Sequence, residues 1–430
     1  MRILHTADWH LGQTLHGISR AWEHARFFEH LLDTLIPRHA VDALVIAGDV
    51  FDVGSPPAEA QRAYYAFLAE ARRKRPALDI VVVGGNHDAP ARLDAPGALL
   101  SALGVTVVGG LPLTETGDWD LERLLVPLRG ASGEVEALMV ALPYLRPSDL
   151  PRSRAEAWAR AGLDSEPDEP SSEGRRDLVD GHRDVYAALV EAAKRRCPSG
   201  AALLATGHAY VAGGQLSELS ERKIQQGNQQ ALPASIFPED LAYVALGHLH
   251  LGQTVSERPM ARYSGSPLPL SMAELGYDHH VLLVETRGEK LHSVIPCQLP
   301  RAVPLKRLPE VHAPLEEVLP LLEALPRAPD PGAEPTQAPL LEVRVRLERA
   351  EPRLRRQIEA ALDGAWVRLV RIDVERPAAS SEAESAPTRL TELQPEEVFR
   401  AAVRRARGAE PTDELLAAFH ELVETVGAAE

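Results

Sequence analysis

The sequence predicts an α/β fold across its first two thirds, because short apolar runs alternate with loops and amphipathic helical stretches. The apolar runs that predict strands are RILHTA (2–7), ALVIA (43–47), IVVV (80–83), ALLAT (202–206) and YVAL (243–246). Between them, two stripes of apolar residues recur at helical spacing and are expected to face a core or a subunit contact. They comprise Ala25, Phe28, Leu32 and Leu35, and Ala60, Tyr64, Phe67, Leu68 and Ala71.

The composition limits the class of protein. A chain of 430 residues has room for two or three domains. No apolar run approaches the length of a membrane span, and Met1–His10 lacks the pattern of a secretory signal. Cys197 and Cys297 lie far apart without a CxxC pair, which argues against a disulfide framework or a thiolate zinc site. The expected location is therefore the cytoplasm.

The net charge of −16 would normally disfavour binding to nucleic acid, because clustered Lys and Arg side chains bind phosphate groups. This objection concerns the whole chain and not any single face of it. It also weakens if a negatively charged substrate meets bound metal cations.

Changes in composition divide the chain into four expected parts. They are an α/β domain (1–294), a small domain of sheet and helices (295–376), a linker (377–390) and a helical tail (391–430). The small domain is predicted from LEVRVRL, in which apolar and charged residues alternate as in a strand with two different faces. Its apolar positions are Leu341, Val343, Val345 and Leu347, and its charged positions are Glu342, Arg344 and Arg346. Acidic or proline-rich surface loops are expected at 164–177 and 326–339.

The tail predicts two short helices. A helix start at Pro395 is followed by one apolar stripe within 398–403, and a second stripe occupies 415–426. Helices this short on a flexible linker cannot bury their apolar faces alone. They either fold back on the main body or dock into a groove of a partner protein, and we favour docking.

The ends of the five predicted strands carry the candidate active site. The carboxyl ends of strands in α/β folds converge on one crevice, and glycines beside them leave room for a substrate. Here the strand ends deliver Asp8 and His10, Asp49, Asn86 and His87, His208, and His248 and His250. One such motif alone would indicate a turn or a helix cap, whereas five in this order indicate metal binding.

Without His87, the candidate ligands are two carboxylates, one amide and four imidazoles, which is too many for one tetrahedral ion. Two metals are therefore implied, and this mixture of nitrogen and oxygen fits Mn, Fe or Zn better than Mg or Ca. Two divalent cations against two carboxylates leave a positive surplus that attracts a phosphodiester. A metal pair suits phosphoester hydrolysis, because it activates a water and stabilises charge on the attacking and leaving oxygens.

Several polar residues near these motifs allow two interpretations. His87 is expected to protonate or stabilise the leaving oxygen, and the alternative is a supporting hydrogen bond beside Asn86. Asp52 either orients a ligand or caps the next helix. In GHLH (247–250), strand geometry places both histidines on one face and invites a single-metal chelate, whereas the ligand count requires two ions. His5 is expected to be a core residue of its strand.

The order of these motifs resembles the calcineurin-like metallophosphoesterases, and within them the SbcD family of nuclease subunits. The segments that carry the resemblance are HTADWHLGQ, GDVFDVGSPP, GGNHD, GHLH and YSGSPLPLS. The resemblance covers essentially the whole chain. It implies two mixed β-sheets sandwiched by helices, a small α+β capping domain, and a C-terminal helix pair that binds the SbcC ATPase.

The resemblance also implies how the ligands divide. One metal would be bound by Asp8, His10, Asp49 and His250, and the other by Asn86, His208, His248 and the shared Asp49, with His87 as the catalytic histidine. The implied cofactor is a pair of divalent ions, most simply Mn²⁺. The implied reaction is ATP-dependent double-strand exonuclease and single-strand or hairpin endonuclease cleavage of DNA, in repair, recombination, replication and the processing of palindromes.

A homodimer is implied as well, through helices near 57–74 and 92–103. Tyr64, Tyr65 and Phe67 would then lie at the interface between subunits.

Two other classes of function stay open on the residues alone. A small-molecule phosphodiesterase or phosphatase would leave the second domain and the tail without a task. A non-catalytic scaffold is disfavoured by the intact His87 and the full set of ligands.

Overall fold

The computed structural model describes residues 1–163, 178–215, 231–257, 259–328, 334–376, 399–400, 403–404, 412 and 415–416. The loop expected at 164–177, part of the loop expected at 326–339 and most of the tail expected at 391–430 lie outside the described residues. The chain divides into two compact units, Met1–Glu375 and Arg376–Glu430. In the second unit, residues 399–400, 403–404 and 415–416 are helical.

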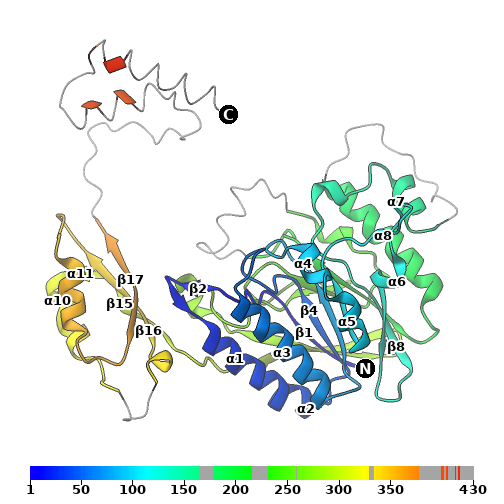
Figure 1. Ribbon diagram of the computed structural model, residues 1–430, viewed down its shortest axis with the longest axis horizontal. Coiled ribbons are helices and arrows are strands. Elements are labelled where there is room, and N and C mark those ends of the chain that lie inside the picture. Colours follow the sequence, from blue (N-terminus) through cyan, green and yellow to red (C-terminus); the bar gives the residue numbers. More distant parts are fainter. Residues whose placement is uncertain are drawn as a thin grey trace. The chain divides into compact units, whose positions relative to one another are not determined.

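Two six-stranded sheets form the centre of the first unit (Figure 1). In spatial order, the first contains β14 (Lys290–Gln298), β13 (His280–Arg287), β1 (Arg2–Thr6), β4 (Ala43–Ala47), β5 (Asp79–Val83) and β6 (Val105–Val108). The second contains β11 (Gln253–Glu257), β12 (Met260–Tyr263), β10 (Tyr243–Gly247), β9 (Ala202–His208), β8 (Val135–Val140) and β7 (Leu125–Arg129). In each sheet, four neighbouring strands run parallel, and the other two strands pair antiparallel with their neighbours. The expectation of two mixed sheets is confirmed.

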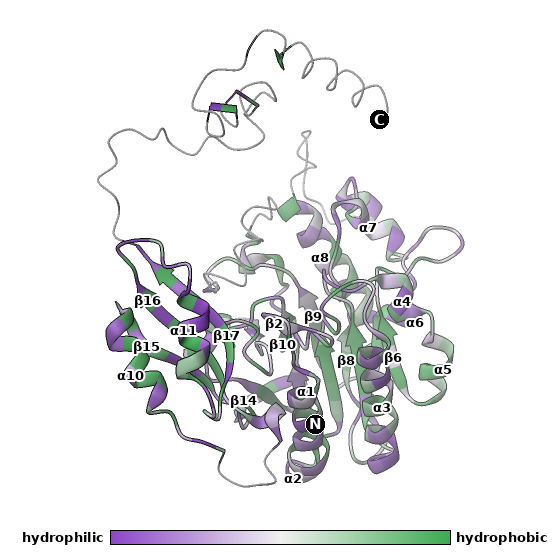
Figure 2. Cartoon of the chain, turned by 60° about the vertical axis from the view of Figure 1, so that its left-hand side comes forward, coloured by the Kyte–Doolittle hydropathy of each residue, from purple (hydrophilic) through white to green (hydrophobic). Residues whose placement is uncertain are grey.

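Helices cover the outer faces of both sheets, which gives four layers. The apolar sides of α1 (Ala21–His30) and α3 (Ala58–Lys74) share a buried cluster with β1 and β4, and α8 (Leu178–Arg196) shares another with β9 and β10. Figure 2 shows hydrophobic residues in the inner strands such as β8, and a mixture of hydrophilic and hydrophobic residues on the helices. The shorter elements are β2 (Thr14–Leu15), β3 (Ile18–Ser19), α2 (Ile36–Arg38), α4 (Pro90–Asp94), α5 (Gly97–Ala102), α6 (Leu121–Leu124) and α7 (Arg154–Arg160). None of the described helices is both long and apolar enough to cross a membrane.

The buried stripe of α1 differs from the predicted one. Ala25 is exposed and Leu32 is only partly buried, whereas Phe27 and Leu31 lie in the core. The helix continues into a π-helical turn at Leu31–Leu35, and a wider turn rotates the side chains that follow. Before this turn, the buried face follows His24, Phe27, Phe28 and Leu31 at regular helical spacing, so the predicted stripe includes Ala25 in error.

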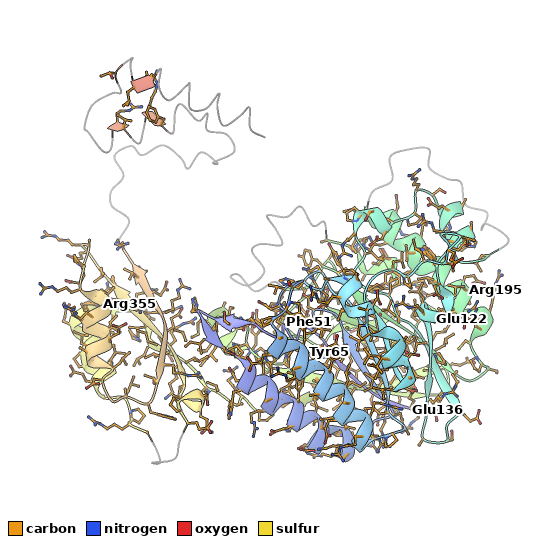
Figure 3. The ribbon with its side chains drawn as sticks, viewed as in Figure 1. Phe51, Tyr65, Glu122, Glu136, Arg195 and Arg355 are labelled. Carbon is orange, nitrogen blue, oxygen red and sulfur yellow. The ribbon has the colours of Figure 1, made fainter. Side chains whose placement is uncertain are left out.

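The expected role of Tyr64 and Phe67 in a subunit interface is wrong. Both side chains of α3 are buried within the single chain, at 1% and 3% exposure. The Tyr64 ring contacts Phe51 with centroids 5.4 Å apart, and the Phe67 ring meets Trp9 edge-on at 5.2 Å. Large aromatic rings on the sheet-facing side of a helix gain more from burial in the core than from an exposed position. Tyr65, labelled in Figure 3, is partly exposed.

A third sheet follows the first two along the chain. It is parallel, with β15 (Leu305–Pro314), β16 (Leu340–Arg346) and β17 (Arg368–Glu375), and its connections are α10 (Leu315–Glu323) and α11 (Leu354–Ala361). Leu341, Val343 and Val345 of β16 pack with these helices, as the alternation predicts. Glu342 on the other face is also buried, at 2% exposure. Arg307 Nε donates to its Oε2 atom at 2.6 Å, which offsets the cost of burying this charge.

Candidate metal centre

The seven predicted ligands and His87 come together where five strands of the two central sheets end. Asp8 and His10 follow β1, Asp49 follows β4, Asn86 and His87 follow β5, His208 ends β9, and His248 and His250 follow β10. Two groups have ligand atoms within 4.8 Å of one another: Asp49 with His10 and His87, and Asp49 with His208 and His248. Asp49 belongs to both groups, so its carboxylate lies between two clusters of imidazoles.

The backbone at the site is strained. Asp8, His10, Asp49 and His248 have φ values of 53°, 47°, 48° and 107°, in the left-handed region that side chains rarely adopt. The Asp8 amide donates to Gly48 O and the His10 amide to Asp49 O, both at 3.0 Å, which ties two strained loops together. Strain of this kind persists where the surrounding structure overdetermines it, and it concentrates at functional sites.

Two glycines make room for ligand side chains. Gly48 has a φ of +93°, and a Cβ atom there would collide with the His208 ring. A Cβ atom on Gly85 would collide with the Asp49 carboxylate. The glycines of the GD and GGNHD motifs therefore serve the close approach of ligands from neighbouring strands.

His10 and His250 form one half of the site. Their ring centroids are 5.3 Å apart, and His10 Nε2 lies 3.5 Å from Asp49 Oδ2. Each Nδ1 atom has a carboxylate partner, Asp52 Oδ1 at 3.2 Å for His10 and Glu274 Oε1 at 3.0 Å for His250. An imidazole that donates its Nδ1 proton to a carboxylate keeps the Nε2 lone pair for a metal.

Asp52 lies in the loop between β4 and α3. Its carboxylate contacts the His10 ring, whereas α3 starts at Ala58 with Pro57 in the capping position and no side-chain cap. Asp52 therefore orients a candidate ligand and does not cap the helix.

His208, His248 and Asn86 form the other half of the site. Asn86 Oδ1 lies 3.0 Å from His208 Nε2 and 2.8 Å from His248 Nδ1, and the two rings are 5.2 Å apart. His208 Nδ1 faces Ala47 O at 3.0 Å, and its Nε2 lies 3.4 Å from Asp49 Oδ2. His248 Nε2 is buried and has no hydrogen-bonding partner among the described residues. The two histidines of GHLH thus face different halves, which fits the two-metal interpretation.

The electrostatics of the site favour bound cations. Burial raises the pKa of Asp8 to about 7, and its oxygens accept hydrogen bonds from the His248 amide at 2.9 and 3.1 Å. Burial would also raise the pKa of Asp49, but nearby His208 outweighs this and holds the pKa well below its usual range. No lysine or arginine in the described part of the chain forms an ion pair with either carboxylate. Divalent metals would supply the missing positive charge, so the residues present fit a two-metal centre.

Burial also fixes the protonation of the histidines. It lowers the pKa of His248 to about 3, which keeps this ring neutral and able to bind a metal. Burial acts in the same direction on His208, but the negative charge of Asp49 outweighs it and raises the pKa to about 9. A proton on His208 therefore partly balances Asp49 where no metal does.

His87 differs from the four histidines among the candidate ligands because it is exposed. Its amide donates to Asp49 Oδ1 at 2.9 Å, and its Nδ1 lies 2.7 Å from Asp52 O. Its ring is edge-on to His10 with centroids 4.8 Å apart. The loop thus fixes His87 beside the ligand cluster while leaving the ring accessible to a substrate.

Two supporting residues were not identified from the sequence. The Asp88 carboxylate accepts hydrogen bonds from the amides of Val50, Phe51 and Gly85 at 2.9 to 3.1 Å, and so joins the loops after β4 and β5. The other is Glu274, which is fully buried and contacts the His250 ring. Asp88 could have been noticed within GGNHD, but no spacing rule connects Glu274 to a ligand 24 residues away.

Known protein families match most of the chain. The calcineurin-like phosphoesterase family model matches residues 1–252, and the type 5 capsule protein repressor C-terminal domain model matches residues 301–407. The SbcD subunit of the SbcCD nuclease of Rhodobacter capsulatus is 42% identical over 405 residues, which cover 94% of both chains. Its counterpart in Escherichia coli K12 is 34% identical over 409 residues, 93% of this chain and 92% of its own. The Bacillus subtilis counterpart is 41% identical over 295 residues, 67% of this chain and 68% of its own.

The fold and the residues at the strand ends define a calcineurin-like phosphoesterase. Within that class, the chain belongs to the SbcD family, whose similar members carry the name of the SbcCD nuclease.

Proposed function

We propose that the protein is the nuclease subunit of an SbcCD-type complex and hydrolyses DNA phosphodiester bonds with two divalent metals. The observation that carries this proposal is Asp49, whose carboxylate lies between two groups of imidazoles, His10 with the exposed His87 and the buried His208 with His248. A single carboxylate shared by two ligand groups is suited to a metal pair. When bound, such a pair lowers the pKa of a water and stabilises negative charge on the reacting oxygens. The homologues named as SbcCD nuclease subunits support DNA as the substrate.

The ligands divide into two sets in this proposal. Asp8, His10, Asp49 and His250 would hold one metal, and Asn86, His208, His248 and Asp49 the other. Contacts between His10 and His250, and between His208, His248 and Asn86, support this division. Mn²⁺ suits this mixture of imidazole, amide and carboxylate groups.

His87 would protonate or stabilise the leaving oxygen. Its exposure lets it reach a substrate, and its hydrogen bonds to Asp49 and to the Asp52 backbone hold the ring in place. Because the Nδ1 proton is shared with Asp52 O, the Nε2 atom is the one available to act on the substrate.

The decisive experiment compares DNA with a small ester. Purified protein with Mn²⁺ is assayed on linear duplex DNA and on a chromogenic diester, with and without an SbcC-type ATPase. Cleavage of DNA supports the nuclease, whereas robust turnover of the diester with no cleavage of DNA would refute it. In the same assay His87→Ala should keep both metals and lose about 10²- to 10⁴-fold in kcat. The exposed His292 provides the matched control, and its alanine variant should remain active.

The proposed roles of the small domain and the tail follow from membership of the SbcD family. We propose that the small domain (295–376) caps the nuclease domain (1–294), and that the tail (391–430), after the linker (377–390), docks on an SbcC-type ATPase. Removing residues 391–430 should abolish co-purification with that ATPase and leave Mn²⁺ binding intact. Retained co-purification would refute the docking role.

We also propose a homodimer through the surface of α3 and α5. Leu99 in α5 and Leu103 directly after it are 67% and 42% exposed, so this surface carries two large apolar side chains that a subunit contact would bury. Size-exclusion chromatography with light scattering should give a dimer for the native chain and a monomer for Leu99→Glu. If the variant remains a dimer, the interface lies on another surface of the protein.

A further inference from the structure

The segment 264–276, which we call the strap, runs from β12 towards β13 and contacts one candidate ligand twice. The amide of Ser266 donates to His250 O at 3.1 Å, and Glu274 Oε1 lies 3.0 Å from His250 Nδ1. The second oxygen of Glu274 accepts the Leu270 amide at 2.7 Å, so the carboxylate is fixed inside the strap itself. The strap therefore sets both the backbone and the ring position of His250.

The strap is anchored to the nuclease domain at its middle. Gln13 Nε2 donates to Leu270 O at 2.9 Å, and an Arg20 guanidinium nitrogen donates to Pro269 O at 2.6 Å. The backbone amide of Gln13 in turn donates to His10 O at 3.0 Å. The strap and the loop of His10 are thus connected on the side of the same candidate metal.

The third sheet holds the other end of the strap. An Arg307 guanidinium nitrogen from β15 donates to Met272 O at 2.9 Å, while its Nε is paired with Glu342. Met272 is 2% exposed and packs in a cluster with Leu305 and Leu340. Met272 and Glu274 lie in one short 3₁₀ helix, Met272–Gly276, so a shift of the Arg307 contact moves the carboxylate at His250.

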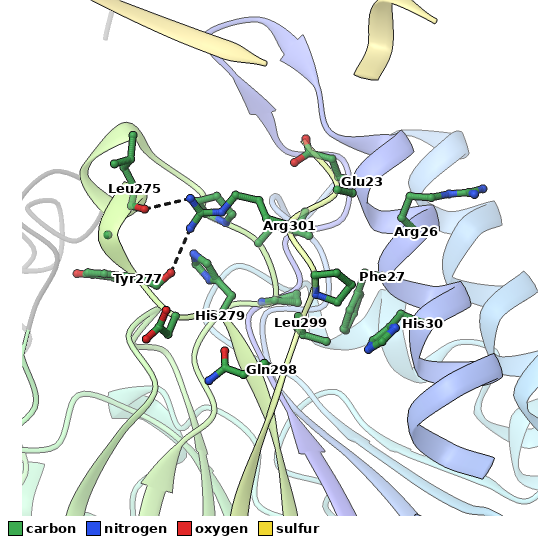
Figure 4. Close-up of a pocket in the computed structure, with 17 residues that line it drawn as sticks. Glu23, Arg26, Phe27, His30, Leu275, Tyr277, His279, Gln298, Leu299 and Arg301 are labelled. Carbon is green, nitrogen blue, oxygen red and sulfur yellow. Dashed lines mark hydrogen bonds between the residues drawn. The ribbon is translucent and has the colours of Figure 1, made fainter. Parts of the chain in front are cut away.

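The segment between the nuclease domain and the third sheet makes a further contact. Figure 4 shows Arg301 from this segment donating to Leu275 O and Tyr277 O, at 3.0 and 3.1 Å. The 3₁₀ helix that carries Glu274 is therefore held by arginines from two elements outside the nuclease sheets, and its position depends on theirs.

We propose that Glu274 is a positioning residue for His250, and that Arg307 transmits the position of the third sheet to this ligand through the strap. The inference rests on the proposed two-metal site. Glu274 accepts a hydrogen bond from the Nδ1 proton of His250, which keeps the Nε2 lone pair for the metal and fixes the ring plane. Arg307 acts one step further away, by setting where the carboxylate stands.

The two metals should respond differently to this device. In the proposed division, His10 and Asp8 share their metal with His250. The ligands of the other metal are Asn86, His208 and His248. Within the described chain, their side chains form hydrogen bonds with one another and with residues outside the strap. Loss of a carboxylate that orients a histidine ligand costs about 10- to 100-fold in metal affinity. One Mn²⁺ should therefore weaken while the other stays unchanged.

The test is a calorimetric Mn²⁺ titration of the full chain, made without DNA. Glu274→Ala is expected to weaken one of two Mn²⁺ sites by about 10- to 100-fold. Arg307→Ala should weaken the same site by a smaller factor, and Arg307→Lys, which can still donate to Met272 O, should recover part of the loss. Nuclease activity of both alanine variants should rise towards the native level as Mn²⁺ is increased.

Arg344→Ala is the matched control. Arg344 lies on the same face of the third sheet and pairs with the same Glu342 at 3.6 Å, but its hydrogen bond is to Glu310 O and not to the strap. Native Mn²⁺ affinity at both sites in Arg307→Ala, or equal weakening in Arg344→Ala, would overturn the role of Arg307. Two unchanged sites in Glu274→Ala would overturn the whole proposal. A native chain that binds two Mn²⁺ but cleaves no DNA would refute the proposed function and leave this inference standing.

Discussion

The first unit buries carboxylates in two places, and it balances their charge in opposite ways. In the third sheet, Glu342 has Arg307 at 2.6 Å, Arg344 at 3.6 Å and Arg371 at 3.7 Å. At the strand ends, Asp8 and Asp49 have backbone amides and imidazoles around them, but no arginine or lysine pairs with them in the described residues.

This difference separates a structural network from a site that needs a ligand. A buried carboxylate with guanidinium partners is already neutralised, and removing it leaves the arginines without a partner. A buried carboxylate surrounded by imidazoles alone remains short of positive charge, because the proton on His208 balances only part of it, and His248 also keeps a buried nitrogen without a partner among the described atoms. The first network should matter for folding and the second for binding of metal.

Asp8→Asn is expected to have the largest effect on function. The variant should lose Mn²⁺ binding at its site and lose nuclease activity to background, because the amide cannot supply the ligand charge. In EDTA it should unfold at the same temperature as the native chain or higher, since an uncompensated buried charge has been removed. Thermal unfolding by circular dichroism checks this, and a clear loss of stability in EDTA would contradict the comparison.

The two histidines of GHLH give the next largest effect. His248→Ala and His250→Ala should each retain one tight Mn²⁺ and weaken the other by more than about 100-fold, which is the upper range for loss of a merely supporting group. Metal analysis of the two variants, with a titration of the remaining site, measures this. If either variant loses both ions, the division of GHLH between two metals is wrong.

Glu342→Gln should act chiefly on stability. Three arginines would lose a charged partner, and we expect a loss of about 1–3 kcal/mol in the free energy of unfolding. The arginines are 22% to 36% exposed, which lets water replace part of the interaction. Urea unfolding gives the value, and Mn²⁺ stoichiometry should stay at the native level. If the variant also loses a bound metal ion, the network in the third sheet is not separate from the metal site and the comparison is wrong.

The smallest effect concerns His5, a buried imidazole away from the metal ligands. Burial lowers its pKa from 6.5 to about 3, and its Nδ1 pairs with the Tyr243 hydroxyl at 2.9 Å. Between these pH values the unfolded chain binds a proton and the folded chain does not, so stability falls as the pH falls. His5→Leu should reduce this slope by up to about 1.4 kcal/mol per pH unit between pH 6 and 4. Urea unfolding in EDTA at several pH values tests it, and an unchanged slope in His5→Leu would contradict it.

Much of the fold and the site could be predicted from local sequence. The five apolar runs became β1, β4, β5, β9 and β10, and each predicted ligand lies at or just after the end of one of them. Short buried strands followed by polar loops are encoded by neighbouring residues, so no long-range information is needed. His5 is buried within its strand, as expected.

Other features depend on pairings between distant segments. The register of β9 and β10 sets Gly247 opposite His208, which brings His248 to His208 and leaves His250 to His10. Burial of Tyr64 and Phe67, the arginines around Glu342, and the contact of Glu274 with His250 arise in the same way.

The sequence by itself therefore determined the α/β class, the order of the strands along the chain and the chemical types of the ligands. Only the tertiary structure decided which ligands share Asp49, which polar residues support them and which apolar faces are interior. The physical reason is that hydrophobic periodicity is local, whereas sheet register and the sharing of buried charge join residues that lie far apart along the chain.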